Sequence, residues 1–271
     1  MPRLATLFVG SANRPEFREA SAGLSRWGEV ERAADAEAAV AAIRDGRIAP
    51  DVIVVAQAFP GQFSHEAIDR LRREAPLARV LGLLGSWCEG ESRSGSPWPA
   101  VARTYWHQWP ARCDWELCRM ARGERCSWAM PVTASDEERI LADDEFHGEA
   151  AATGIVVVRS ASREMADWLS EAARRRGFSA IWRHSADDVP SEGVRAAIFD
   201  GTDLGDRECD ELRRLSAAVQ PAPVVALLPF PRVEDERRAI SAGAGAVLSK
   251  PAAILDLFGR LDALLAGGGT L

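Results

Sequence analysis

The chain has 271 residues, of which 47% are hydrophobic and 27% are charged. These values are typical of a folded globular protein and exclude a disordered chain. A formal net charge of −7 argues against nucleic-acid binding, so we expect protein or small-molecule partners. No apolar run approaches the roughly 20 residues that cross a bilayer, and the first residues lack a signal-peptide core, so we expect a cytoplasmic protein without membrane contact.

Two halves of the chain repeat one order of elements, in which short apolar runs alternate with amphipathic helical segments. The runs cover 4–9, 30–34, 51–56 and 78–84 in the first half, and 154–158, 178–182, 195–200 and 223–228 in the second. The helical segments cover 15–26, 35–44, 64–74, 164–175 and 208–217. Continuous apolar runs indicate strands that are buried on both faces, and their alternation with helices predicts doubly wound α/β sheets.

The composition between the halves predicts the domain boundaries. Residues 124–152 are acidic and have no strand pattern, so we interpret them as a linker between a domain at 1–123 and a domain at 153–267. Within the linker, Ser135 and Glu138 have the spacing of a capping box for a helix over 135–143.

The second half resembles the receiver domains of bacterial two-component response regulators. Ala196-Ala-Ile-Phe-Asp200 is similar to their third strand, which ends in the phosphoacceptor aspartate, and residues 224–228 are similar to their fourth strand. Residues 238–251, which end in Lys250-Pro251, resemble the stretch from fourth helix to fifth strand, and residues 253–265 would form the last helix. The resemblance implies a flavodoxin-like fold with a parallel five-stranded sheet.

The first half resembles the same family more weakly. Residues 50–61 have the form of the third strand and its Pro-Gly turn, but Ala56 stands at the phosphoacceptor position. Residues 104–110 resemble the fifth strand and its proline, with Trp109 where the lysine would be. We therefore expect two receiver-like domains in tandem, both degenerate and the first more so.

The resemblance implies a phosphorylation chemistry whose parts are incomplete here. Mg²⁺ prefers carboxylate and other oxygen ligands, and in the family an acidic pair after the first strand supplies them. Gly10-Ser11 and Arg159-Ser160 replace that pair, and Leu84 and Leu228 replace the Thr or Ser that contacts the phosphoryl group. Only Asp200, as phosphoacceptor candidate, and Lys250, as phosphate or ion-pair candidate, are retained.

Asp200 and Lys250 admit two interpretations. In one, Asp200 is phosphorylated, Asp203 or Asp206 assists a magnesium ion, and Lys250 contacts the phosphate. In the other, Asp200 and Lys250 form a structural ion pair, and the guanidinium of Arg159 takes the place of the cation. We favour the second, and expect no resident metal or cofactor, with Mg²⁺ involved only if Asp200 is phosphorylated.

Tryptophan is concentrated in one segment of the first half. Six of the nine tryptophans lie within residues 85–128, namely Trp87, Trp98, Trp106, Trp109, Trp115 and Trp128. They are interpreted as core that fills the place of a missing helix, as anchors of a partner surface, or as walls of a small-molecule pocket. The interaction candidates are Trp87, Glu89, Glu91, Arg93, Trp98, Trp106 and Trp109.

Other catalytic or metal patterns are weak. The spacing of the zinc candidates does not match paired ligands; they are Cys88, His107, Cys113, Cys118 and Cys126. Ser86, His107 and Asp114 could be drawn as a hydrolase set, but no G-x-S-x-G motif surrounds Ser86. We therefore expect a non-enzymatic signalling or scaffold protein that acts through protein contacts, with a histidine kinase or another regulator among its partners. A phosphorelay receiver and a small-molecule binder are the alternatives. The resemblance also implies homodimerisation through residues 234–242, 246–249 and 254–264.

Overall fold

The computed structural model of the chain describes residues 3–91, 95–99, 101–131, 133–134, 138, 153–186, 189–190 and 192–267. The chain divides into two compact units, unit 1 over Met1–Glu145 and unit 2 over Phe146–Leu271. No helix in the described residues has the length and apolar character that crossing a membrane requires. The expected helix over 135–143 and its Ser135 cap lie outside the described residues, apart from Glu138.

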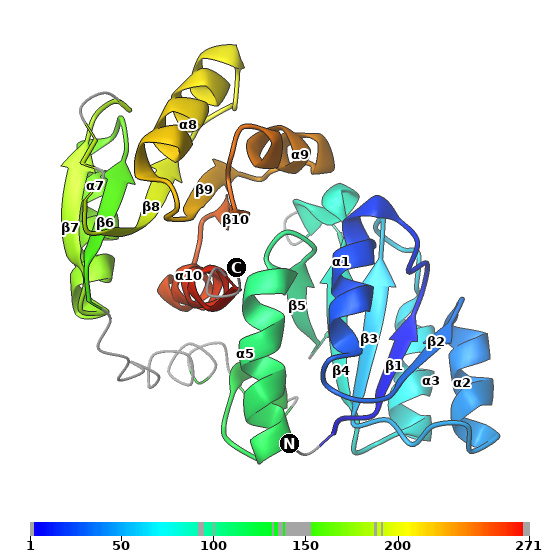
Figure 1. Cartoon of the computed structure of the whole chain (residues 1–271). Helices are drawn as coiled ribbons and strands as arrows, with labels where there is room; N and C mark the ends of the chain where they lie inside the picture. Colours follow the sequence, from blue (N-terminus) through cyan, green and yellow to red (C-terminus); the bar gives the residue numbers. More distant parts are fainter. Residues whose placement is uncertain are drawn as a thin grey trace. The chain divides into compact units, whose positions relative to one another are not determined.

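Unit 1 is a five-stranded, all-parallel sheet in the order β2-β1-β3-β4-β5, covered by helices (Figure 1). Its strands are β1 (Thr6–Val9), β2 (Val30–Ala33), β3 (Val52–Gln57), β4 (Arg79–Leu84) and β5 (Ala102–Tyr105). Its helices are α1 (Pro15–Leu24), α2 (Ala36–Arg44), α3 (His65–Glu74) and α5 (Trp109–Arg122), with two 3₁₀ turns, η1 (Ser86–Cys88) and η2 (Ser127–Ala129).

The central strands of unit 1 are buried on both faces, as their continuous apolar sequence predicts. Every residue of β3 is buried. Alternate residues of β1 and β3 point to one face, where Val9 and Val55 pack with Val40 of α2 and Leu71 of α3. The hydrophobic effect on both faces therefore holds these strands at the centre of the sheet.

Residues 124–131, which the sequence places in the acidic linker, pack on unit 1 instead. Cys126, Trp128 and Met130 are all buried. Trp128 lies against Trp109 of α5, with ring centroids 4.8 Å apart. The acidic composition of the following residues concealed these three apolar side chains, which belong to the core of unit 1.

Unit 2 repeats the architecture with the strand order β10-β9-β8-β6-β7, again all parallel. Its strands are β6 (Ile155–Arg159), β7 (Ser179–Arg183), β8 (Val194–Asp200), β9 (Val224–Pro229) and β10 (Ala246–Lys250). Its helices are α7 (Arg163–Arg175), α8 (Asp206–Val219), α9 (Val233–Ser241) and α10 (Ile254–Gly267). Between β7 and β8 the described residues form no helix, whereas α2 occupies the corresponding connection of unit 1.

The expected fold class is confirmed. Each unit has the flavodoxin-like order in which the first strand lies between the second and the third. In such sheets the carboxyl ends of the strands form the edge where ligands bind, so this edge is where the candidate residues matter.

Candidate functional site

The carboxyl edge of unit 2 brings the retained receiver residues together. Asp200 is the last residue of β8, Lys250 is the last residue of β10, and Ser160 follows directly after β6. The apolar runs before them fix these positions, because buried strands hold the backbone and leave the first polar residue at the edge. Asp200 and Ser160 are themselves buried.

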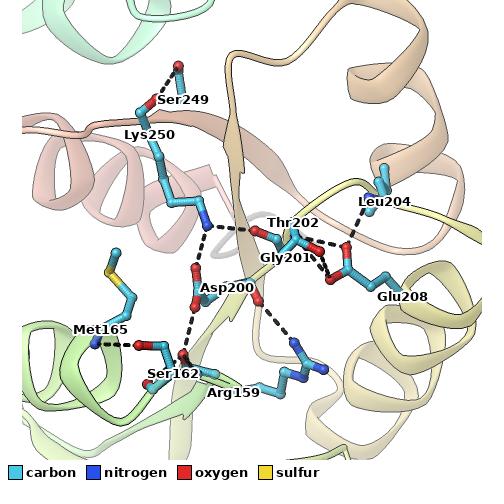
Figure 2. A network of polar contacts seen from close by, with 11 residues as sticks. Arg159, Ser162, Met165, Asp200, Gly201, Thr202, Leu204, Glu208, Ser249 and Lys250 are labelled. Atoms are coloured by element: carbon cyan, nitrogen blue, oxygen red, sulfur yellow. Dashed lines mark hydrogen bonds and ion pairs between the residues drawn. The ribbon is translucent and has the colours of Figure 1, made fainter.

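Both carboxylate oxygens of Asp200 are engaged within the protein. The Lys250 Nζ donates to Asp200 Oδ1 at 2.7 Å, and the Ser160 hydroxyl lies 2.6 Å from Asp200 Oδ2. The Lys250 Nζ also donates to the Gly201 carbonyl at 2.6 Å, and Figure 2 shows the ammonium group directed at both acceptors. The ion pair that the second interpretation expects is therefore present.

Arg159 lies beside Asp200, but its guanidinium does not contact the carboxylate. It donates to the backbone carbonyl of Asp200 at 2.9 Å (Figure 2) and to the carboxylate of Glu211 on α8. The guanidinium also stacks over the Phe199 ring at 4.7 Å. Arg159 thus joins β6, β8 and α8, and its charge is neutralised by Glu211.

The loop between β8 and α8 is held by a residue that the sequence did not single out. The Glu208 carboxylate accepts hydrogen bonds from the backbone N–H groups of Thr202 and Leu204, at 2.9 Å each, and from the Thr202 hydroxyl at 2.7 Å (Figure 2). These contacts direct Glu208 away from Asp200. The sequence shows that α8 begins with acidic residues, but it does not show where the Glu208 carboxylate points.

The residues at this edge do not fit a magnesium ion. The Asp203 carboxylate accepts from the Gly205 N–H at 3.0 Å, and Asp206 is fully exposed and lies 3.5 Å from Arg238. Neither assists Asp200. Throughout the described residues, no three His, Cys, Asp or Glu side chains are grouped to hold a metal ion. Mg²⁺ needs several oxygen ligands in near-octahedral geometry, which a single engaged carboxylate does not supply.

The corresponding edge of unit 1 has lost these groups. Ala56 is fully buried and pairs with Leu83 of the neighbouring strand. Asp200 pairs with Leu227 in the same way in unit 2, so Ala56 holds the phosphoacceptor position, as expected. A carboxylate from Glu16 of α1 reaches this edge instead, where it accepts from Ser86 through the backbone N–H at 3.3 Å and the hydroxyl at 3.2 Å.

The lysine position of unit 1 belongs to Trp106, not to Trp109 as the sequence predicts. Tyr105 lies beside Leu84, and Ser249 lies beside Leu228, so the next residues, Trp106 and Lys250, are equivalent. Trp109 instead starts α5, because Pro110 after it is in the first turn of that helix, where proline is favoured. The sequence interpretation matched a Trp-Pro pair to the Lys-Pro pair, which shifted the register by three residues.

Most tryptophans of the Trp-rich segment lie in the core of unit 1. Trp98, Trp106 and Trp109 are buried, whereas Trp87 in η1 is 71% exposed. Trp98 packs over Gly82 of β4, where a Cβ would meet its ring at 3.3 Å, and its indole N–H donates to the Phe63 carbonyl at 3.0 Å. These side chains pack as the core interpretation expects.

The acidic candidates of this segment contact polar side chains within unit 1. Glu91 is buried, pairs with Arg103, and accepts from the Gln57 side chain at 3.2 Å. Glu89 lies 3.5 Å from the Nε2 atom of His107. Arg93 lies outside the described residues.

His107, which follows β5, is buried. Its ring stacks on Tyr105 and meets Trp106 edge-on, with centroids 5.6 Å and 5.5 Å away. Burial lowers the pKa of His107 to about 4, despite the nearby Glu89 carboxylate. The imidazole is therefore neutral at physiological pH.

Solved structures that are similar to this chain are receiver domains. The receiver domain of Francisella response regulator 1452 is 17% identical and matches with a TM-score of 0.37, over 42% of this chain and 98% of that chain. A CheY-like receiver domain protein from Methanospirillum hungatei JF-1 is 16% identical, with a TM-score of 0.38 over 43% and 97% of the two chains. A response regulator from Thermotoga maritima is 19% identical, with a TM-score of 0.37 over 42% and 99%.

No protein-family model matches the sequence, and no curated protein is significantly similar to it. The receiver-like architecture described above therefore stands on the strand order and pairing of the two units themselves.

Proposed function

We propose that the protein is a non-enzymatic signalling or scaffold protein, built of two pseudo-receiver units, that binds other proteins without phosphorylation of Asp200. One observation carries the proposal: both oxygens of the Asp200 carboxylate are engaged, by Lys250 and by Ser160.

Charge explains why this arrangement opposes phosphorylation. Phosphoryl transfer depends on cations that neutralise the charge on the transferred group and align it with the attacking oxygen. At this edge the Lys250 ammonium is the cation that contacts Asp200, and its position is fixed by two hydrogen bonds. The guanidinium of Arg159, which donates to the Asp200 backbone carbonyl, is paired with Glu211. The positive charges of Lys250 and Arg159 are thus already neutralised by Asp200 and Glu211, and neither is left to neutralise a phosphoryl group.

A partner contact in unit 1 is proposed at Trp87. Among the interaction candidates, Trp98, Trp106, Trp109 and Glu91 are buried, and a protein partner needs accessible anchors. Trp87 is 71% exposed, and Phe59, which follows the neighbouring strand, is 51% exposed. The two loops adjoin, because the Gly85 N–H donates to the Gln57 carbonyl at 2.8 Å. Exposed aromatic side chains on neighbouring loops support a protein contact rather than an enclosed ligand site.

The proposal is tested by intact-mass spectrometry of the full chain after treatment with acetyl phosphate and Mg²⁺. We expect no adduct of about 80 Da, the mass that one phosphoryl group adds. A receiver domain of known activity serves as the positive control under the same conditions.

Two variants distinguish specific from incidental modification. An adduct that is present in the wild type and in Asp203→Ala, but lost in Asp200→Ala, would refute the proposal and support the phosphorelay alternative. An adduct that persists in Asp200→Ala would be modification elsewhere, and would leave the proposal standing.

A further inference from the structure

A charged groove lies between α8 and α9 of unit 2, and neither Asp200 nor Lys250 lines it. Its volume is about 350 Å³. Its walls include Asp206, Cys209, Asp210 and Arg213 from α8, and Arg237 and Arg238 from α9. We call this surface the arginine groove.

The helical repeat produces the groove. Asp206, Asp210 and Arg213 are spaced by four and three residues, so they share one side of α8. Leu212 and Leu215 of the same helix are buried in the core, which turns the polar side outward. On α9, Ala239 is buried while Arg237 and Arg238 are exposed.

The arginines are weakly held and are accessible. Arg213 pairs with Asp210, and Arg238 lies 3.5 Å from Asp206, but these side chains are 46% to 105% exposed. Exposed ion pairs contribute only about 0 to 1 kcal/mol, so an incoming carboxylate replaces them at little cost. Within the described residues, no hydrogen bond or ion pair engages the side chain of Arg237.

The charge of the groove is opposite to that of the chain. Three arginines and two aspartates give it a net charge of +1, whereas the whole chain carries −7. Guanidinium groups bind carboxylates through two parallel hydrogen bonds. The sign of its charge therefore makes this groove favourable for an anionic ligand, although the chain as a whole is acidic.

An apolar neighbour points to a protein segment as the ligand. Ile240 lies one helical turn after Arg237 and is 47% exposed. A free inorganic anion gains nothing from contact with an apolar side chain. A protein segment with apolar and acidic residues can contact both Ile240 and the arginines.

We propose that the arginine groove binds an acidic segment of a protein partner, with carboxylates on Arg213, Arg237 and Arg238 and an apolar side chain on Ile240. This groove proposal specifies the chemistry of the partner. It rests on the proposed function only because both take the partner to be a protein.

The test is fluorescence anisotropy of the full-length protein with a short fluorescein-labelled peptide of glutamate and leucine, at about 0.15 M salt, where surface charges are screened beyond roughly 8 Å. The groove variant carries Arg213→Ala, Arg237→Ala and Arg238→Ala. The matched control carries Arg163→Ala, Arg174→Ala and Arg175→Ala, which remove three paired arginines of α7 that are 56% to 70% exposed.

We expect saturable binding that weakens about tenfold or more in the groove variant, less in Ile240→Ala, and less than about twofold in the control. The same peptide with glutamine in place of glutamate should not bind. Circular dichroism checks that each variant is folded.

Three results would overturn the proposal: no saturable binding by the wild type, equal weakening in the two triple variants, or complete displacement of the peptide by inorganic phosphate at millimolar concentration. The phosphorylation state of Asp200 enters none of these measurements, so failure of this proposal is distinguishable from failure of the proposed function.

Discussion

Replacing Lys250 by methionine tests how far the edge of unit 2 depends on its ion pair. Asp200 is 6% exposed, and its carboxylate faces the Lys250 ammonium at 2.7 Å. Methionine keeps most of the volume but removes the charge, so the buried carboxylate retains only the Ser160 hydroxyl. Removing one partner of a buried ion pair costs about 3–5 kcal/mol, and we expect this loss in the stability of unit 2.

Native-state hydrogen exchange of the full chain measures the loss in the unit where it occurs. We expect faster exchange of the amides in β8 and β9, and unchanged exchange in β3 and β4 of unit 1, which serve as an internal standard. Arg175→Met, which removes an exposed pair with Glu171, is the matched control and should change exchange by less than about 1 kcal/mol.

A double variant separates the buried charge from the side chains themselves. Asp200→Leu with Lys250→Met removes both charges, and replacing a buried ion pair by apolar groups is often neutral or stabilising. We therefore expect the double variant to recover most of the stability lost in Lys250→Met. The reasoning is refuted if Lys250→Met changes the exchange of β8 by less than about 1 kcal/mol, or if the double variant is as unstable as the single one.

Three further predictions concern the buried polar groups and the tryptophans. The pKa of His107 falls from 6.5 to about 4 on folding, so the unfolded state binds the proton more tightly and stability is lost as the pH drops from about 6.5 to 4. At 1.36 kcal/mol per pKa unit, the free energy of unfolding should fall by about 3 kcal/mol over this range. His107→Gln should flatten the curve of unfolding free energy against pH, and an unchanged curve would contradict this prediction. Arg159→Met leaves a buried carboxylate on α8 and should destabilise unit 2 by about 3–5 kcal/mol in hydrogen exchange, whereas a change near zero would show that the pair is dispensable. Trp98→Ala should destabilise unit 1 by about 3–5 kcal/mol in urea unfolding followed by circular dichroism, and Trp87→Ala by less than about 0.5 kcal/mol; equal effects would contradict their assigned burial.

The sequence was sufficient to predict the architecture because the apolar composition of a short segment indicates a buried strand. The run that ends at Asp200 and the run that ends at Ala56 are continuous and apolar, and both form central strands. The resemblance of residues 238–251 to a fifth strand adds Lys250 to the edge where Asp200 lies, since parallel strands end at the same side of a sheet. The closeness of these two residues was therefore expected from the sequence, whereas the ion pair between them is seen in the structure.

The register of the fifth strand in unit 1 was not predictable in the same way. Trp106 and Trp109 are both large and apolar, and Pro110 made Trp109 resemble the lysine of the Lys-Pro pair. The hydrogen bond from the Trp106 N–H to the Leu84 carbonyl, at 2.8 Å, decides the alignment. Such a bond joins residues that are far apart in the chain, and composition does not encode it.

By itself, the sequence determined the two parallel sheets, their strand order by resemblance, and the residues that stand at their carboxyl edges, because periodicity and apolar runs report burial directly. Tertiary structure alone decided that Arg159 turns to Glu211, that Glu208 holds the loop after β8, and that the arginines of α8 and α9 face one groove. Charged side chains are long and flexible, and their partners are chosen by which helices pack side by side, a property of the folded chain and not of any local segment.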